Sequence, residues 1–406
     1  MAVIGAVMVP HPPIILPEIG RGEEKKIQAT TDAYSKAMAF AASLNPETVV
    51  IASPHSVMYS DYFHISPGVD AEGDFRRFRA RDVSIRASYD YEFVHTLCGL
   101  CDRDEFPAGT MGERDPELDH GTMIPLYFLN RYMDPADYRV VRIGLSGLPL
   151  ADHYRLGRKI REAAERLDRR VLFIASGDLS HKLKDDGPYG FDENGPVYDE
   201  RIMDVMGRAQ FDELLDFDEA FCDRAAECGH RSFVMMAGAL DGCALRVCRL
   251  SHEGTFGVGY GVCTYQVTGQ DSMRHFLQIW SKKKKKELDI KREKEDLFVR
   301  LARAGVESAV RSGKRLPDGE IRDLIRTAAD VPSQDPEEIR AAQSDLLNRR
   351  AGVFVSIHKN GSLRGCIGTI SPTCSSIAQE IAQNAVSAST RDPRFPAIRP
   401  SELDEL

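Results

Sequence analysis

The sequence predicts an α/β fold with a central sheet, followed by a smaller second domain. Apolar, strand-like runs alternate with amphipathic helical segments from the N-terminus to about residue 267. The composition then changes near residue 280, where a lysine-rich segment interrupts the pattern. Beyond it, two strand-like runs flank an Asn-Gly pair, the strongest short hairpin signal. The 406 residues suffice for two or three domains of ordinary size.

The first domain, residues 1–280, holds the alternating elements. After a first strand ending near Val9, buried strands are predicted in TVVIASPHS from Thr48, YRVVRIGLSG from Tyr138, RVLFIASGDLSH from Arg170 and FGVGYGVCTYQV from Phe256. Helices are predicted from Glu23 to Ser43, from Ala151 to Leu167 and from Pro196 to Met206. Because strands and helices alternate, the expected architecture is a central sheet flanked by helices.

The second domain is predicted from residue 296 to residue 406. The charged segment 281–295, SKKKKKELDIKREKE, separates it from the first domain and is expected to be a solvated linker or an exposed helix. Helices are predicted from about Asp296 to Ser312 and from Asp318 to Ala329, before a hairpin around Asn360 and Gly361. This domain is therefore expected to be α+β. No closing element is predicted in its last residues, RPSELDEL, so the domain is expected to be truncated at its C-terminus.

Composition and charge exclude several classes of protein. A net charge of −9 argues against general nucleic-acid binding, which needs a cationic surface. No apolar run approaches the roughly 20 residues of a membrane span, and the N-terminus lacks the basic segment of a signal peptide. Nine cysteines without regular spacing suit a reducing compartment, so a cytoplasmic location is expected.

Three histidines follow apolar runs of the first domain, at the points where the chain leaves the predicted sheet. His11 follows AVIGAVMV, His55 follows TVVIAS, and His181 follows VLFIAS. Ligands of open α/β sheets bind beyond the carboxyl ends of the strands. If the strands are parallel, these side chains meet at one edge of the sheet. A single histidine of this kind is usually a turn residue, whereas three indicate a site.

Further candidates lie before two apolar helices. His120 stands in DHGT, where Gly121 permits a close backbone approach, although Asp119 or Thr122 could simply cap the helix. Glu227 precedes a small-residue helix, either as a first-turn carboxylate favoured by the helix dipole or as an anionic metal ligand. Two histidines and one carboxylate make the facial triad of non-haem Fe(II) sites. His11, His55 and Glu227 could supply it, but spacing alone does not dictate this choice.

One cysteine of the second domain is a candidate nucleophile. Cys366 lies in LRGCIGT, two residues after Arg364, and a neighbouring arginine favours the reactive thiolate. The alternative is a small buried cysteine on a strand, beside a glycine where backbones approach closely. Because His358, across the predicted hairpin, is the one histidine nearby, the structural interpretation is slightly favoured.

Taken together, these motifs resemble two known families. VPHPP, ASPHS, DHGT, SGDLSH and ECGHRSF occur in an order similar to the class III extradiol dioxygenases of the LigB family, whose relatives include Memo proteins, over about 270 residues. LRGCIGT and RDPRFPAI resemble the AMMECR domain. The whole layout resembles the AmmeMemoRadiSam system proteins, in which both modules are fused and a radical-SAM protein is a partner. The resemblance implies a central mixed sheet flanked by helices, plus the α+β AMMECR domain.

The resemblance also implies roles for individual residues. His11 and His55 match the two histidine metal ligands, His181 the catalytic histidine, and His120 a second active-site histidine. The third ligand is Glu in the dioxygenases and Cys in the Memo relatives. Glu227 and Cys228 are adjacent here, so both remain open. Glu227 suits Fe(II), the expected metal, whereas Cys228 suits softer Cu(I) or Zn.

The implied activity is that of an Fe(II)-dependent oxidoreductase that opens a catechol-type or related small aromatic substrate. His181 would act as the base, because a histidine pKa near neutrality suits proton transfer. Two alternatives remain, since fold does not fix function. One is a metal-dependent hydrolase or modification enzyme that works with the radical-SAM partner, and the other is a non-catalytic Memo-like binding protein. A homo-oligomer is also compatible with relatives of this fold.

Overall fold

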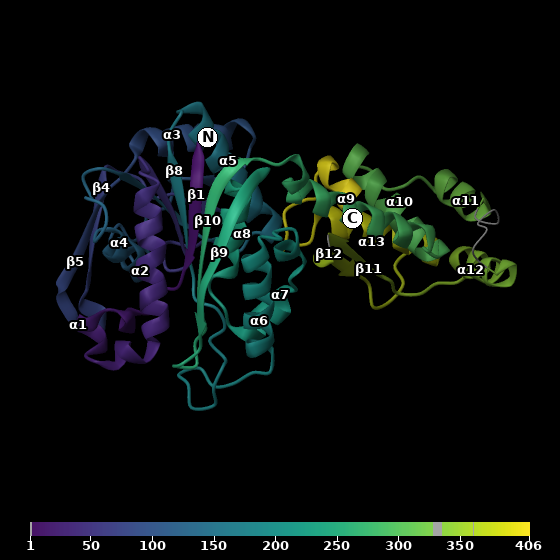
Figure 1. The fold of residues 1–406 in the computed structure, drawn as a ribbon. Coiled ribbons are helices and arrows are strands. Elements are labelled where there is room, and N and C mark those ends of the chain that lie inside the picture. The colour runs from purple at the N-terminus through teal and green to yellow at the C-terminus, as the bar shows by residue number, and fades with distance from the viewer. Residues whose placement is uncertain (1, 328–334, 360) are drawn as a thin grey trace. The chain divides into compact units, whose positions relative to one another are not determined.

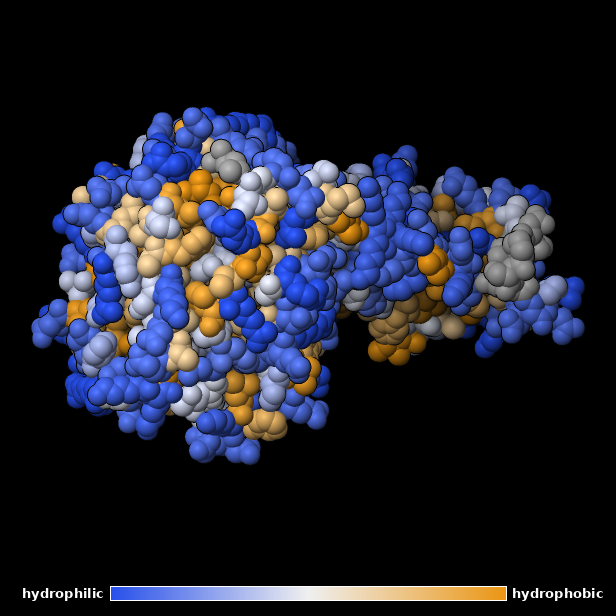
Figure 2. Space-filling view, in the orientation of Figure 1, coloured by the Kyte–Doolittle hydropathy of each residue, from blue (hydrophilic) through white to orange (hydrophobic). Residues whose placement is uncertain are grey.

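A computed structural model describes residues 2–327, 335–359 and 361–406. It divides into two compact units, Met1–Ile279 and Trp280–Leu406, each of which is described by itself (Figure 1). The charged segment 281–295 is not an irregular linker, because most of it belongs to helix α9 (Phe276–Glu293), which no proline or glycine interrupts. Most α9 side chains after residue 280 are exposed. Figure 2 accordingly shows a hydrophilic surface over this helix.

A six-stranded mixed sheet forms the centre of the first unit, in the order β7-β2-β8-β1-β10-β9. The first four strands in this order pair parallel to one another. The strand β10 pairs antiparallel with both of its neighbours, β1 and β9. The strands are β1 (Val3–Val9), β2 (Thr48–Ser53), β7 (Arg139–Gly144), β8 (Val171–Ser176), β9 (Cys243–Glu253) and β10 (Tyr260–Gln270). The side chains of β2 and β8 are buried throughout, as expected for parallel strands covered on both faces. The predicted α/β architecture with a mixed sheet is therefore confirmed.

Helices cover both faces of this sheet. On one face, α2 (Gln28–Ser43) and α4 (His120–Leu129) share a hydrophobic cluster with alternate residues of β1, β2 and β8. On the other, α8 (His230–Ala239) packs on β8 and on α5 (Leu150–Arg166). The α5–α8 contact depends on a glycine, since an added Cβ at Gly157 would lie 2.0 Å from the Met235 carbonyl oxygen.

The remaining elements of the first unit surround this core. They are α1 (Pro17–Gly20), β3 (Phe63–His64), β4 (Asp70–Phe75), β5 (Ala80–Ser88), α3 (Tyr91–Arg103), β6 (Ala108–Gly109), α6 (Asn194–Arg208) and α7 (Glu219–Ala225), besides short 3₁₀ turns. The predicted helix from Glu23 begins as a 3₁₀ turn over Glu23–Ile27, so α2 starts five residues later than expected. None of the helices in the described part of the chain is both long and apolar enough to cross a membrane.

The second unit is built from helices and one hairpin. After α9 it contains α10 (Leu297–Ser312), α11 (Asp318–Thr327), α12 (Pro336–Asn348), β11 (Phe354–Lys359), β12 (Ser362–Gly368) and α13 (Ile377–Thr390). The strands β11 and β12 pair antiparallel, as predicted, and pack with the helices around a shared apolar core. The predicted turn residue Asn360 and the last two residues of the predicted helix up to Ala329 lie outside the described residues.

Candidate metal centre

The carboxyl ends of three neighbouring parallel strands deliver three of the predicted histidines. His11 follows β1, His55 follows β2 and His181 follows β8, and β8 lies between the other two strands. The ends of parallel strands lie at the same edge of a sheet. Segments that are far apart in the sequence therefore meet at this edge.

Three imidazoles converge there. Each of His11, His55 and His120 offers a ring nitrogen, and these three atoms lie within 4.8 Å of one another. The Nε2 atoms of His11 and His55 are 3.0 Å apart, and the rings of His55 and His120 have centroids 4.0 Å apart. His120 begins α4, which Asp119 caps by accepting a hydrogen bond from the Thr122 amide at 3.0 Å. His120 is thus both next to a helix cap and part of the cluster.

The buried ring of His11 has a defined tautomer. The hydroxyl of Ser176 donates its single proton to the Gly121 carbonyl oxygen at 2.6 Å, because a carbonyl can only accept. The Nδ1 atom of His11, 2.9 Å from the same hydroxyl oxygen, must then donate to it. The Nε2 atom consequently presents a lone pair to the cluster. This is the arrangement by which an outer hydrogen bond orients a ligating histidine.

The site keeps these imidazoles neutral. Burial, reinforced by the charges of His55, His120 and His181, holds the pKa of His11 well below its ordinary value. Burial and the neighbouring His55 lower the pKa of His120 to about 4. Burial also lowers the pKa of His55, against the opposing effect of Asp119. Neutral imidazole nitrogens are the form that binds metal ions.

Glu227, predicted to be a metal ligand, has its carboxylate at the start of α8. Its Oε2 atom accepts a hydrogen bond from the His230 amide at 2.6 Å, at the start of α8. The carboxylate therefore satisfies a free backbone donor of the helix. Burial raises its pKa to about 7. The structure does not group Glu227 with the three clustered histidines, and its role as a ligand stays a prediction.

Cys228 is the neighbour of Glu227 that faces the histidines. Its Sγ atom lies 3.6 Å from Nε2 of His11 and accepts from the Asp178 amide at 3.3 Å. Burial raises the pKa of this thiol well above its ordinary value. A thiol next to one imidazole is a possible further donor, so the alternative ligand predicted from the sequence remains open.

The donor set fits one metal ion. Two nitrogen donors at about 2.1 Å from one ion and about 90° apart are separated by about 3.0 Å, which matches the 3.0 Å between the His11 and His55 nitrogens. At the same angle, nitrogen and sulfur donors at about 2.1 and 2.3 Å are about 3.1 Å apart. The 3.6 Å between Cys228 and His11 corresponds to a wider, near-tetrahedral angle. Imidazole suits Fe, Zn and Cu, and a thiolate favours the softer ions.

His181 flanks the cluster, with its ring stacked on another aromatic side chain. Its buried Nε2 atom has no partner among the described residues, and its ring stacks on Tyr189 with centroids 4.9 Å apart. Burial, with the charge of His55, lowers the pKa of His181 to about 4. The ring is therefore uncharged at neutral pH, and its pKa lies below the near-neutral value expected from the sequence for a base.

Two polar residues of the site were missed by the sequence reasoning. Asp178 is buried and its Oδ1 atom accepts from the His11 amide at 2.8 Å, while burial raises its pKa to about 7. Ser176 is the residue that orients His11. Both belong to the motif SGDLSH, of which only the histidine was predicted to be a site residue.

Cys366 of the second unit lies on β12, opposite Ser356 of β11. The Sγ atom is 3.1 Å from the Ser356 hydroxyl oxygen. The Cys366 amide donates to Asp392 at 2.8 Å, and its carbonyl accepts from Arg394 at 3.0 Å. The loop RDPRF is thus anchored to this strand through the backbone of Cys366, and a nucleophilic role stays a prediction.

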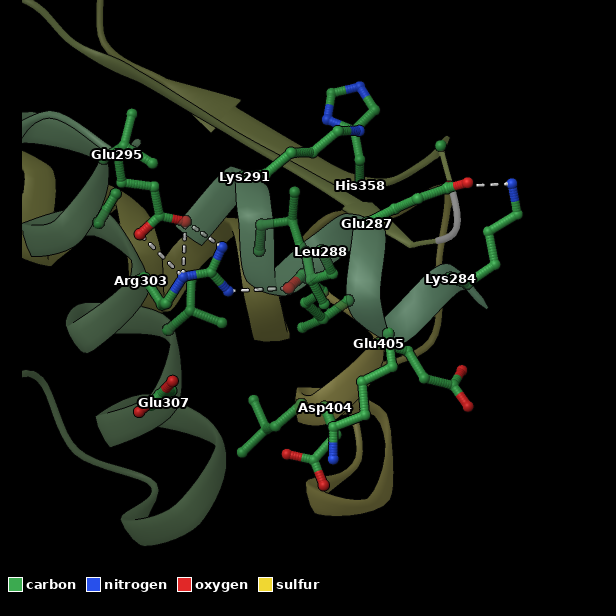
Figure 3. A pocket seen from close by; sticks show the side chains of 18 of the residues that line it. Lys284, Glu287, Leu288, Lys291, Glu295, Arg303, Glu307, His358, Asp404 and Glu405 are labelled. Carbon is green, nitrogen blue, oxygen red and sulfur yellow. Dashed lines mark hydrogen bonds and ion pairs between the residues drawn. The ribbon is translucent and has the colours of Figure 1, made fainter. Parts of the chain in front are cut away.

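The second unit also contains a cavity of about 700 Å³, between α9, α10, β11 and the last residues of the chain (Figure 3). Two ion pairs lie among the residues that line this cavity. Arg303 contacts Glu295, and Lys284 lies 3.3 Å from Glu287. In the first unit, a cavity of about 250 Å³ is lined by Glu227 and Cys228, the two predicted alternative ligands, together with Pro54 and His230. The smaller cavity, not the larger one, adjoins the candidate chemistry.

Comparisons with known proteins agree with this description. Residues 5–263 match the family model described as the catalytic LigB subunit of aromatic ring-opening dioxygenase, and residues 299–406 match the AMMECR1 model. A protein of Clostridium acetobutylicum is 35% identical over 414 residues, which cover 100% of this chain and 83% of that protein.

Two further similarities are more limited. A Thermotoga maritima protein is 52% identical over 73 residues, which are 18% of this chain and 41% of that protein. The crystal structure of an uncharacterised Escherichia coli protein covers 65% of this chain and 99% of its own, with 16% identity and a TM-score of 0.43. On the evidence of the family model and the Clostridium relative, the chain belongs to the LigB family of aromatic ring-opening dioxygenase subunits and carries an AMMECR1 domain in its second unit.

Proposed function

We propose that the first unit is a metal-dependent oxidoreductase of extradiol dioxygenase type, which binds Fe(II) and opens a catechol-type or related small aromatic substrate. The observation that carries this proposal is the convergence of His11, His55 and His120, whose donor nitrogens lie within 4.8 Å of one another. Membership of the LigB family supports the reaction class. The low pKa of His120, about 4, supports a donor that is free at neutral pH.

His11, His55 and His120 would hold the metal, with Cys228 or the predicted Glu227 as a further ligand. The bound metal would supply its remaining coordination positions for a substrate oxygen and for dioxygen. The cavity of about 250 Å³ beside Pro54 and Cys228 has room for a single aromatic ring. An engineered cavity of about 150 Å³ binds benzene, which sets the scale.

The residues around the cluster would handle the protons. His181 has a buried, unpartnered Nε2 atom, so it would accept the proton of a substrate hydroxyl. The ring of Tyr189, stacked on His181, would limit the movement of that base. The hydrogen bond from His11 Nδ1 to Ser176 would hold the ring of His11 while substrate binds.

The test begins with metal analysis of the full chain purified without oxygen. We expect about one equivalent of iron, lost in His55→Ala, and oxygen consumption when catechols are added under air. His181→Gln should keep the iron but lose turnover by about 100-fold or more. His95→Gln, on an exposed histidine of α3, is the matched control and should retain both. An iron-loaded protein that consumes no oxygen with any catechol would contradict the proposed reaction.

A further inference from the structure

A buried arginine lies behind the histidine cluster. Arg142, on β7, is 1% exposed. Its Nε atom donates to the Ser66 hydroxyl at 2.6 Å, and its two terminal nitrogens donate to the carbonyl oxygens of Glu117, at 2.6 Å, and Asp115, at 3.1 Å. The planar fork of an arginine can serve three acceptors in this way, whereas a lysine ammonium is a single point on a flexible stem.

These bonds hold a segment that has no regular structure of its own. No helix or strand is assigned within the described residues 113–119, which lead directly to His120. The carboxylates of Glu113 and Asp119 lie 3.7 and 3.9 Å from the guanidinium and compensate its buried charge. Arg142 therefore fixes the path by which the chain reaches His120.

Asp119 connects this segment to both His55 and His120. Its Oδ1 atom accepts from the Ser53 hydroxyl at 2.6 Å and from the Thr122 amide at 3.0 Å. Ser53 in turn accepts from the His55 amide at 3.3 Å. One carboxylate thus joins the segment that bears His55 to the helix turn that begins with His120.

We infer that Arg142 is a positioning residue of the metal centre: by anchoring residues 113–119, it sets His120 relative to His55. The inference rests on the proposed metal site, but it assigns a role to a side chain that touches none of the donor atoms. It predicts that Arg142 acts on metal affinity through His120, and not merely on the stability of the fold.

The test is a double-mutant cycle on the full chain, read by anaerobic titration with Co(II) and Zn(II). Arg142→Lys should weaken binding by about 10- to 100-fold, as substitutions behind metal ligands do, and should change the visible absorption of bound Co(II). In a His120→Ala background the same substitution should weaken binding by less than about 3-fold, because coupled residues are not additive. If the fold-loss of metal affinity in the double variant equals the product of the two single losses, Arg142 acts independently of His120. That result would indicate a general structural role and overturn the inference.

Two further variants keep the test decisive. Arg86→Lys changes an exposed arginine paired with Asp70 at 2.6 Å, and should leave metal affinity unchanged. If Arg142→Lys does not fold, Ser53→Ala removes one hydrogen bond to Asp119, and unchanged affinity in that variant would overturn the inference. A wild-type chain that binds neither metal contradicts the proposed function instead, whereas a binding wild type with an equally tight Arg142→Lys contradicts the inference alone.

Discussion

The first turn of α4 packs so closely on the end of β2 that a Cβ atom at Gly121 would lie 2.4 Å from the Ser53 hydroxyl oxygen. The same atom would lie 3.4 Å from Cδ2 of His55. Gly121→Ala should therefore push α4 away from the histidine cluster. We expect a lower free energy of unfolding, by about 1 to 3 kcal/mol, as for overpacked cores, together with weaker metal binding by titration.

Gly99→Ala is the matched control for this substitution. Gly99 is also helical, in α3, but an added Cβ there meets nothing within 4 Å. Alanine in a helix interior is more favourable than glycine by roughly 0.5 to 1 kcal/mol. Gly99→Ala should thus raise stability and leave metal affinity unchanged. A Gly121→Ala variant that behaves like Gly99→Ala would show that α4 is free to move.

Removing the Ser176 hydroxyl should disturb the tautomer of His11. In Ser176→Ala, the Nδ1 proton of His11 loses its acceptor, and the proton can move to Nε2, the nitrogen that faces the cluster. We expect metal affinity to fall by about 10-fold, measured by competition with a chelator. Ser251→Ala is the control, because the buried Ser251 hydroxyl has no hydrogen-bond partner among the described residues. Equal affinity in the two variants would contradict the orienting role of Ser176.

The choice between Glu227 and Cys228 can be made with two substitutions. Glu227→Gln keeps an oxygen that can accept from the His230 amide, so α8 should stay capped. Because that carboxylate faces the helix, we expect unchanged metal stoichiometry by elemental analysis. Cys228→Ser should reduce the affinity for Zn(II) more than for Fe(II), since thiolate prefers softer ions. Loss of metal in Glu227→Gln but not in Cys228→Ser would restore the facial triad predicted from the sequence.

His153 should make the first unit less stable in mild acid. It is fully buried in α5, and burial, aided by the charge of Arg231, lowers its pKa to about 3. The unfolded chain binds a proton at this histidine near pH 6.5, so protonation favours unfolding below that pH. Between pH 6 and pH 5 the wild type should lose about 1 kcal/mol more than His153→Gln. Urea unfolding at several pH values measures the difference, and parallel pH profiles would contradict it.

The histidines at the sheet edge could be predicted from the sequence, because each directly follows the apolar run that forms its strand. An apolar run of buried residues predicts a strand, and the polar residue after it lies at the strand's carboxyl end. Three such exits placed His11, His55 and His181 together. The edge strand β9 was missed because only one of its eleven residues is fully buried. The hairpin of β4 and β5 was missed for the same reason, since β4 is largely polar.

The sequence could not decide between Glu227 and Cys228 as a metal ligand, because their positions depend on a loop. Glu227 and Cys228 are adjacent, and one residue of difference turns a side chain from the start of α8 toward His11. Sequence spacing does not resolve such a difference. Arg142 did carry a signal, a charge inside the otherwise apolar strand RVVRIG. A buried charge of this kind needs partners, but two of them are the carbonyl oxygens of residues 115 and 117, which every residue type has and which leave no trace in the sequence.

The position of β8 has a consequence for the order in which the site can form during translation. β1 and β2, which deliver His11 and His55, do not pair with each other, because β8 lies between them. The strand that makes them close, Val171–Ser176, is synthesised more than a hundred residues after His55. A nascent chain in which both histidines have been synthesised therefore still lacks β8, the strand that pairs with both β1 and β2. The proposed metal site can therefore form only after translation has passed Ser176 and β8 has taken its place between β1 and β2.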